Sequence, residues 1–194
     1  HNVHIGYKAG ENAAASHNRN VFIGSCAGQN ATTTNSNVII GTYNVGCAAG
    51  FTGNYNVLIG QRVGCCLSSG AQNIFLGLNS GAKTTTGARN IAFGGFDTLG
   101  ANTTGGCNIA LGGNSLESSN GSNNIALGQS SGALVDSGNC NILLGRQAGN
   151  NITSGSKNVI IGDDVDPPSA TGNCQFAIGS GTSRWIYGDS SFNI

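Results

Sequence analysis

Charge is the property that this sequence has least of. Only 8% of its 194 residues are charged, against about 25% in an average globular chain. The 8 basic and 8 acidic residues give a formal net charge of zero, and no basic block indicates nucleic acid as a partner. With Glu11 and Glu117 as its only glutamates, the chain offers few carboxylates to pair in a glycosidase-type site.

Signals for membranes and secretion are also missing. The longest apolar runs fall far short of the roughly 20 residues that a membrane helix requires, so we expect no membrane insertion. No signal peptide and no initiator methionine are present. Because His1 and Asn2 already lie within a repeat, we expect the chain to be an internal piece of a longer polypeptide.

Glycine is abundant, with 33 residues, more than twice its usual share of about 7%. Such a composition could indicate disorder, but 38% of the residues are apolar, and disordered chains are poor in apolar residues. The arrangement of the apolar residues decides the question, because a marker of Asn, three largely apolar residues and Gly recurs throughout. The copies start at Asn2, Asn20, Asn37, Asn56, Asn73, Asn90, Asn108, Asn124, Asn141, Asn158 and, with glutamine in place of asparagine, Gln175.

Successive copies start roughly 17 residues apart, and self-similarity at a nearly fixed period is the signature of a repeat architecture. Counted from its Asn, position 2 is Val, Ile or Phe, position 4 is Ile, Leu or Phe, and position 5 is Gly in all eleven copies. A short β-branched run bounded by glycine indicates a strand between tight turns, for which glycine supplies a positive φ. The glycines at position 5 are Gly6, Gly24, Gly41, Gly60, Gly77, Gly94, Gly112, Gly128, Gly145, Gly162 and Gly179.

This period predicts an all-β fold, because so short a repeat cannot hold a helix pair. It fits one coil of a parallel β-solenoid or β-roll, with two short strands and two turns per coil. At a strand spacing of about 4.8 Å, eleven coils over residues 2–179 would form a rod roughly 50 Å long. Residues 180–194 depart from the repeat and are predicted to be a cap or a junction to a following domain.

The asparagine at position 1 has two interpretations. Stacked amides can hydrogen-bond along the rod as a ladder, or each Asn could only close its own turn. Neither interpretation gives the asparagine a chemical role. The residues assigned a structural role by this repeat are Asn20, Asn37, Asn73, Asn124, Asn141, Gly24, Gly41, Gly77, Gly128 and Gly145.

Position 3 is apolar in ten of the eleven copies, although it faces the opposite way from positions 2 and 4 in a strand. A strand that is apolar on both faces is typically buried on both faces. We therefore predict that position 3 forms an intersubunit face, with threefold symmetry as the natural choice for a fibre. In the alternative, a monomer, position 3 lies under another strand of the same coil. The predicted trimer interface comprises Phe22, Ile39, Leu58, Phe75, Leu143 and Ile160.

The repeats resemble a known group of sequences. Segments such as 124–132 (Asn-Ile-Ala-Leu-Gly-Gln-Ser-Ser-Gly) and 141–149 look like the Asn-x-x-Ile-Gly repeats of phage tail fibres and related bacterial surface proteins. They are also similar to the β-roll heads of trimeric autotransporter adhesins, whose repeat is shorter. The resemblance covers nearly the whole chain and implies a homotrimeric parallel β-roll on a virion or an extracellular surface. No binding residues carry over, because the repeat itself is scaffold.

The single tryptophan, Trp185, lies beyond the last repeat. Solenoids need a cap over the terminal coil, so we assign Trp185 to a cap or a junction, with an aromatic ligand platform as the alternative.

Three groups of residues could bind metal or form cross-links. His1 and His4 could ligate a metal, although a frayed terminal coil explains them as well, and Asp163, Asp164 and Asp166 could bind calcium or form a bulged turn. Neither pattern recurs from coil to coil, so we predict no metal site and no cofactor.

The seven cysteines do not form a zinc pattern. Cys47 and Cys65 both follow Val-Gly in adjacent coils, and they should stack at about 5 Å, within disulfide range. A set of mostly free thiols would suit a virion protein assembled in a cytoplasm better than a secreted protein.

The sequence therefore predicts a non-enzymatic structural segment of a phage tail fibre or a similar surface appendage. It would act as a stiff spacer that associates with itself as a homotrimer, and a host surface glycan or protein receptor is a candidate partner. The alternatives are a secreted bacterial adhesin head and, less favoured, a polysaccharide depolymerase built on a β-helix. Threonine runs occur in only three coils, which argues against an ice-binding face.

Overall fold

The computed structural model describes residues 1–14, 16–45, 50–189 and 191. Its strands form one sheet in chain order, in which β1 to β11 are parallel and β12 pairs antiparallel with β11. The strands are β1 (Val3–Ile5), β2 (Val21–Ile23), β3 (Val38–Thr42), β4 (Val57–Gln61), β5 (Ile74–Leu76), β6 (Ile91–Phe93), β7 (Ile109–Leu111), β8 (Ile125–Leu127), β9 (Ile142–Leu144), β10 (Val159–Asp163), β11 (Phe176–Ser180) and β12 (Ser183–Gly188).

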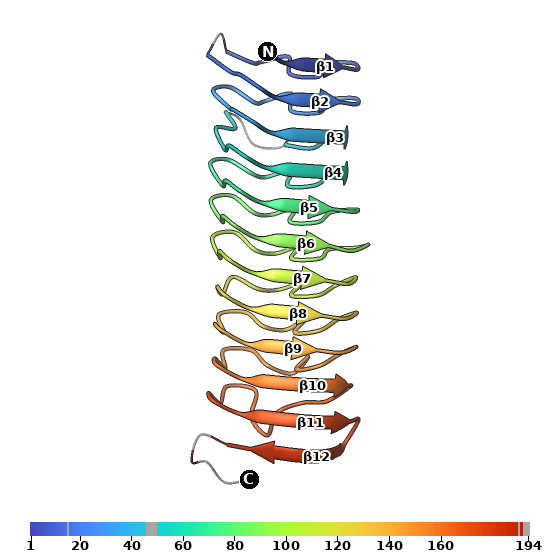
Figure 1. Cartoon of the computed structure of the whole chain (residues 1–194), viewed down its shortest axis with the longest axis vertical. Helices are drawn as coiled ribbons and strands as arrows, with labels where there is room; N and C mark the ends of the chain where they lie inside the picture. The colour runs from blue at the N-terminus through green and yellow to red at the C-terminus, as the bar shows by residue number, and fades with distance from the viewer. Residues whose placement is uncertain (15, 46–49, 190, 192–194) are drawn as a thin grey trace.

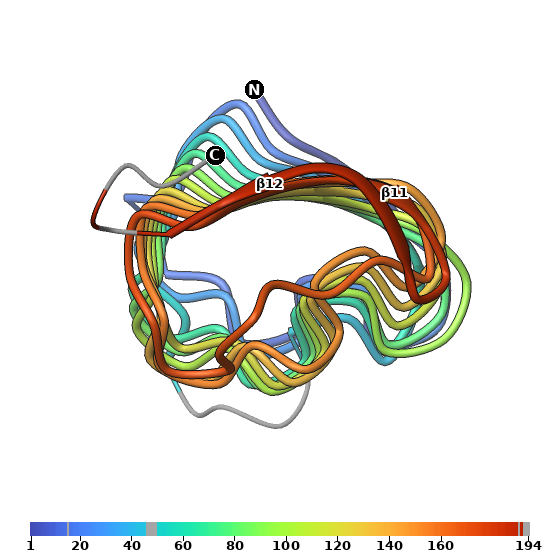
Figure 2. The ribbon, with the colours of Figure 1, turned by 90° about the horizontal axis from the view of Figure 1, so that it is seen from below.

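The chain forms a β-solenoid, as the repeat predicts (Figure 1). We name each coil by the strand that opens it, so that coil 4 begins with β4. Equivalent repeat positions pair across every junction, as when Val21 pairs with Val38 and Val38 with Val57. The small variation in repeat length does not disturb this register, because the turns absorb the extra or missing residues. Viewed down the rod, the sheet forms one flat side of the coil and the turns form the others (Figure 2).

Each described coil contains one strand, so the expectation of two strands per coil is wrong. The other walls consist of turns that still hydrogen-bond from coil to coil, as where the amide of Leu116 donates to the carbonyl of Ser131 at 3.0 Å. Residues in the left-handed conformation interrupt these walls, for example Arg62 and Gln72 with φ of 55° and 60°. A chain that reverses its local twist so often cannot remain extended long enough to form a second strand.

The asparagines at position 1 form the predicted ladder. Asn73 is fully buried, and its backbone amide and its Nδ2 both donate to Oδ1 of Asn56, at 2.9 and 3.1 Å. Its own Oδ1 accepts from the backbone amide of Asn90 at 2.9 Å, and its Nδ2 also donates to the carbonyl of Gly87 at 3.0 Å. The same backbone-to-Oδ1 bond joins successive copies from Asn2 to Gln175. Each amide therefore closes its own coil and also binds the next one.

The glycines at position 5 are required for two reasons. Gly77 has a φ of 124°, which side-chain-bearing residues rarely adopt. A Cβ atom at Gly77 would also lie 1.7 Å from the carbonyl oxygen of Gly94 in the next coil. The turn chemistry was predicted from the sequence, whereas the close approach of neighbouring coils is evident only from the structure.

The core lies inside each coil, and position 3 belongs to it. The prediction that position 3 forms a trimer interface is therefore wrong for these residues, because each is fully buried within the single chain. The residues concerned are Phe22, Ile39, Leu58, Phe75, Leu143 and Ile160. The alternative placement, inside one coil, is the one that the structure shows, although the wall opposite position 3 is made of turns rather than a strand.

Position 3 becomes small near the middle of the rod, where the fully buried Leu99 and Leu116 fill part of the interior. Position 3 is alanine in coils 6, 7 and 8, and buried polar side chains lie in the neighbouring walls, including Thr84, Asn102 and Ser119. The Oγ1 of Thr84, the Oδ1 of Asn102 and the Oγ of Ser119 have no hydrogen-bond partner among the described residues. Buried polar atoms without partners destabilise a fold, so these three atoms are expected to lower the stability of coils 5 to 7.

Positions 2 and 4 point outward and form what we call the outer sheet face. All 22 residues at these positions are Val, Ile, Leu or Phe. In the structure none of them is fully buried, and Phe93 reaches 60% exposure. The residues are Val3, Ile5, Val21, Ile23, Val38, Ile40, Val57, Ile59, Ile74, Leu76, Ile91, Phe93, Ile109, Leu111, Ile125, Leu127, Ile142, Leu144, Val159, Ile161, Phe176 and Ile178.

Strand β12 covers the free edge of β11 at the C-terminal end (Figure 1). The side chain of Trp185 on this strand is 72% exposed, so the backbone of β12, rather than the indole, occupies the edge. Ile186 pairs with Ile178 and continues the outer sheet face by one strand, because directly opposed residues share a face. The junction to a following domain stays a prediction.

Candidate functional site

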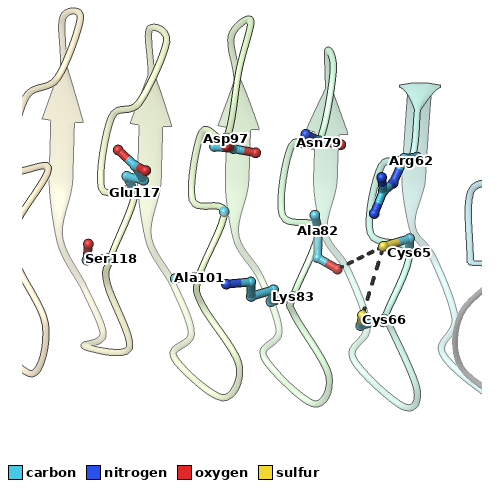
Figure 3. A pocket seen from close by; sticks show the side chains of 11 residues that line it. Arg62, Cys65, Cys66, Asn79, Ala82, Lys83, Asp97, Ala101, Glu117 and Ser118 are labelled. Atoms are coloured by element: carbon cyan, nitrogen blue, oxygen red, sulfur yellow. Dashed lines mark hydrogen bonds between the residues drawn. The ribbon is translucent and has the colours of Figure 1, made fainter.

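A groove of about 480 Å³ crosses coils 4 to 7 of the rod (Figure 3). We call it the mixed-charge groove, because two cationic and two anionic side chains line it. Its residues are Arg62, Cys65, Cys66, Asn79, Ala82, Lys83, Asp97, Gly100, Ala101, Glu117 and Ser118. Four of the 16 charged residues of the chain therefore gather at one place on a nearly uncharged rod.

Local backbone geometry places these side chains at the groove. Arg62, Asn79 and Asp97 each adopt a left-handed conformation, with φ of 55°, 57° and 47°, at the corner that follows the glycine of position 5. Because equivalent corners stack from coil to coil, side chains that are one repeat apart in the sequence become neighbours. Lys83 and Glu117 come from the next turn of coils 5 and 7 and face the same hollow (Figure 3).

The charges of the groove are not paired with one another. The ion pairs among the described residues join Lys8 to Glu11 at 3.3 Å and Arg146 to Asp163 at 2.8 Å, both outside the groove. Glu117 accepts a hydrogen bond from Nδ2 of Asn114 at 3.0 Å, which holds its carboxylate at the rim. Unpaired charges of both signs on a concave surface can bind a polar ligand rich in hydroxyl groups through hydrogen bonds.

The two cysteines of the groove lie at its coil 4 end, next to Arg62 (Figure 3). The Sγ of Cys65 lies 3.9 Å from that of Cys66 and 3.3 Å from the carbonyl oxygen of Ala82. The predicted bond between Cys47 and Cys65 stays a prediction, because Cys47 lies outside the described residues. The histidines of the chain all lie before residue 20, so no imidazole stands beside these thiols as a base.

His4 and His17, at the N-terminal end, pack against each other and against the ring of Phe22. His4 lies parallel to Phe22 with ring centroids 5.0 Å apart, and His17 meets His4 edge-on at 5.0 Å. Burial lowers the pKa of both histidines below their usual range, and for His17 the proximity of His4 lowers the pKa further. Within the described part of the chain, no group of three or more His, Cys, Asp or Glu side chains is arranged to hold a metal ion.

The acidic cluster also has structural partners. Asp163 pairs with Arg146, and the carboxylate of Asp166 accepts from the amide of Asn151 at 3.1 Å. Burial raises the pKa of Asp166 above its usual range. Asp164, Asp166 and Arg184 line a second hollow of about 520 Å³ near the C-terminal end. Contacts within the fold therefore account for Asp163 and Asp166, and the bulged turn stays a prediction.

Sequence reasoning did not identify the mixed-charge groove, because its residues are scattered along the linear chain. Aligned by repeat position, Arg62 is at position 7 and Lys83 at position 11, and both positions turn to the same wall. Mapping the few charges onto the repeat would have grouped them. No protein-family description, curated protein or solved structure matches this chain. The described residues also contain no helix of the length and apolarity needed to cross a bilayer.

Proposed function

We propose that this chain is a stiff structural segment of a fibre, of the kind found in phage tail fibres and related surface appendages, and that it has no enzymatic role. In this proposal the segment works as a homotrimer at a virion or extracellular surface, where it holds an adhesive or receptor-binding part at a fixed distance. A spacer has a mechanical task, which requires a rod that is rigid along its length.

The observation that carries the proposal is the uninterrupted stack from β1 to β11. Three sets of hydrogen bonds run along the same axis, namely the strand ladder, the asparagine ladder and the bonds between successive turns. Bending the rod would stretch all three sets on one side. Since each coil is held mainly by its two neighbours, the same construction can be extended to any length without a larger core.

Stiffness can be measured directly as a distance distribution between two spin labels. Thr33 and Ser154 are exposed and occupy the same repeat position seven coils apart, so labels there should be about 34 Å apart at about 4.8 Å per coil. The labels would be attached to a genetically encoded ketone residue, so that the cysteines stay unmodified. Dilution with unlabelled chain would remove the contribution of label pairs on different chains from the distance distribution. A narrow peak at the expected separation supports the spacer, whereas a broad distribution would refute it.

The mixed-charge groove favours a second candidate, a carbohydrate-binding role such as that of an adhesin head. Its unpaired charges and its hydroxyl and amide groups suit a glycan. Binding to a panel of immobilised glycans should then be lost in Lys83→Ala and retained in Lys157→Ala, an exposed lysine on another coil. Release of reducing ends during the same incubation, abolished by Glu117→Gln, would instead indicate a depolymerase.

A further inference from the structure

The outer sheet face is not explained by the folding of a single chain. Position 3 already supplies the strand's contribution to the core and is fully buried in coils 2 to 11. Positions 2 and 4 lie on the other side of the same strands, yet they carry no polar residue in eleven coils. A one-sided sheet in water ordinarily alternates apolar and polar residues, so the solvent side of this sheet should have been polar.

The apolar stripe is large enough for a stable interface. Eleven strands at about 4.8 Å give a length of roughly 50 Å, and positions 1 to 5 at about 3.3 Å per residue give a width of roughly 13 Å. The flat area is then about 650 Å², beyond the roughly 300 to 600 Å² of the largest patch on a typical monomer. It approaches the roughly 800 Å² per partner that a standard interface buries. The exposure of Phe93, Ile74, Leu127 and Ile142, at 60, 40, 36 and 37%, shows that the stripe continues through the middle of the rod.

The chemistry of the stripe identifies its occupant. With no charged or polar side chain at positions 2 and 4, the face offers nothing to steer or orient a charged partner. It is flat and repeats at the strand spacing along its whole length, so a surface that matches it needs the same spacing. The like face of another copy has that spacing by construction, and two such sheets can pack at the usual distance of about 10 Å with interdigitated side chains.

We propose that the outer sheet face is the surface through which copies of this chain associate, with like faces packed together and the rods parallel. The face of association does not depend on the proposed fibre, whereas the number of copies, three, rests on that proposed function. Geometry is compatible with three copies. The same width of about 13 Å gives a triangle whose sides each lie about 4 Å from the axis, close to half of the sheet-packing distance of about 10 Å.

The test compares two leucines that are both exposed but lie on different walls. Leu127 belongs to the outer sheet face, and Leu134 is 56% exposed on a turn away from the sheet. By light scattering, the wild-type segment should have three times the chain mass of 19.4 kDa. The double variant Phe93→Lys, Leu127→Lys should fall threefold in mass, because charges on an apolar interface oppose association. The variant Leu134→Lys should keep the wild-type mass, and both should keep the wild-type circular dichroism.

Each outcome bears on one of the two proposals. A wild-type monomer, an oligomer that survives the double variant, or dissociation by Leu134→Lys would overturn the assignment of the face. A wild-type dimer that the double variant dissociates would support the face but refute the homotrimer of the proposed function. If the double variant fails to fold, a photo-crosslinking residue at position 127 of the wild-type background decides the matter. Crosslinked chains from position 127 and none from position 134 support the face, and the reverse overturns it.

Discussion

Replacing one asparagine of the ladder should weaken the rod far more than replacing an exposed residue of the same coil. In Asn73→Ala the side chain that bridges coils 4, 5 and 6 is lost. The backbone amide of Asn90 then loses its acceptor at 2.9 Å, and the carbonyl of Gly87 loses its donor at 3.0 Å. Both bonds are buried, so water cannot easily replace the missing partner.

The magnitude follows from these two orphaned groups. Each buried group left without a partner costs about 1 to 3 kcal/mol, so the variant should lose roughly 2 to 6 kcal/mol. Domains are typically stable by only about 5 to 15 kcal/mol, and the expected loss is therefore a large fraction of the total. Because neighbouring coils stabilise one another, the loss should also divide the rod into two units that unfold separately.

Urea denaturation followed by circular dichroism measures the loss, and hydrogen exchange locates it. The control is Thr86→Ala in coil 5, since Thr86 is exposed and its removal should change stability by no more than about 0.5 kcal/mol. Amides on either side of β5 should exchange faster in Asn73→Ala and remain unchanged in the control. A loss for Asn73→Ala that equals the control's would refute the view that the ladder stabilises the stack.

A charge variant at the same position gives a pH signature. Asn73→Asp keeps an acceptor for Asn90 but loses the donor, and a carboxylate there would face the oxygens of Asn56 and Gly87. Burial and these oxygens raise the pKa of the new carboxyl in the folded state. Because the folded pKa is the higher one, stability is retained at low pH and lost as the pH rises through it. Asn73→Asp should therefore approach wild-type stability near pH 4 and be weakest at neutral pH.

Three further predictions follow from the packing and from the titratable groups. Gly77→Ala should lower the free energy of unfolding in urea by at least about 3 kcal/mol, because Gly77 has a φ of 124° and a Cβ there would lie 1.7 Å from the carbonyl oxygen of Gly94. The control Gly113→Ala has open space around its Cβ and should cost little. Thr84→Val should raise the melting temperature by a few degrees, because it replaces an unpartnered buried hydroxyl with a methyl group; a lower melting temperature would show that the hydroxyl is hydrogen-bonded after all. The pKa values of His4 and His17 are lowered in the folded chain, so the unfolded chain binds protons more readily. Protection of coil 1 against hydrogen exchange should therefore fall as the pH drops below about 6.5. Protection that is unchanged at pH 5 would contradict this.

Much of the architecture could be predicted from the sequence because each rule acts between nearest neighbours. The spacing of Asn and Gly determined the period, the register and the number of coils. Because the same contacts recur between every pair of neighbouring coils, predicting how two coils stack also predicts how all eleven stack. Asn73 and Gly77 illustrate this, since their roles follow from the chemistry of an amide and of a residue without a Cβ atom. The same reasoning could not locate the mixed-charge groove, which forms only when corners from four coils are brought together.

Tertiary structure decided which side of the strand lies inside. Strand alternation places positions 2 and 4 opposite position 3, but both sets are apolar, so hydrophobicity alone could not choose between them. The choice depends on the direction in which the chain turns after position 5. In nine of the eleven coils this direction is set by a glycine φ of 124 to 138° and by the left-handed corners that follow. The sizes of the side chains nevertheless distinguish the two faces. Position 3 ranges from alanine to phenylalanine, and its size is balanced within the coil in two cases. The small Ala110 is accompanied by a buried Leu116, whereas the larger Leu143 is accompanied by a buried Ala148. Such compensation is typical of a closed interior, which has a limited volume to fill, whereas the uniformly large residues at positions 2 and 4 had no such limit.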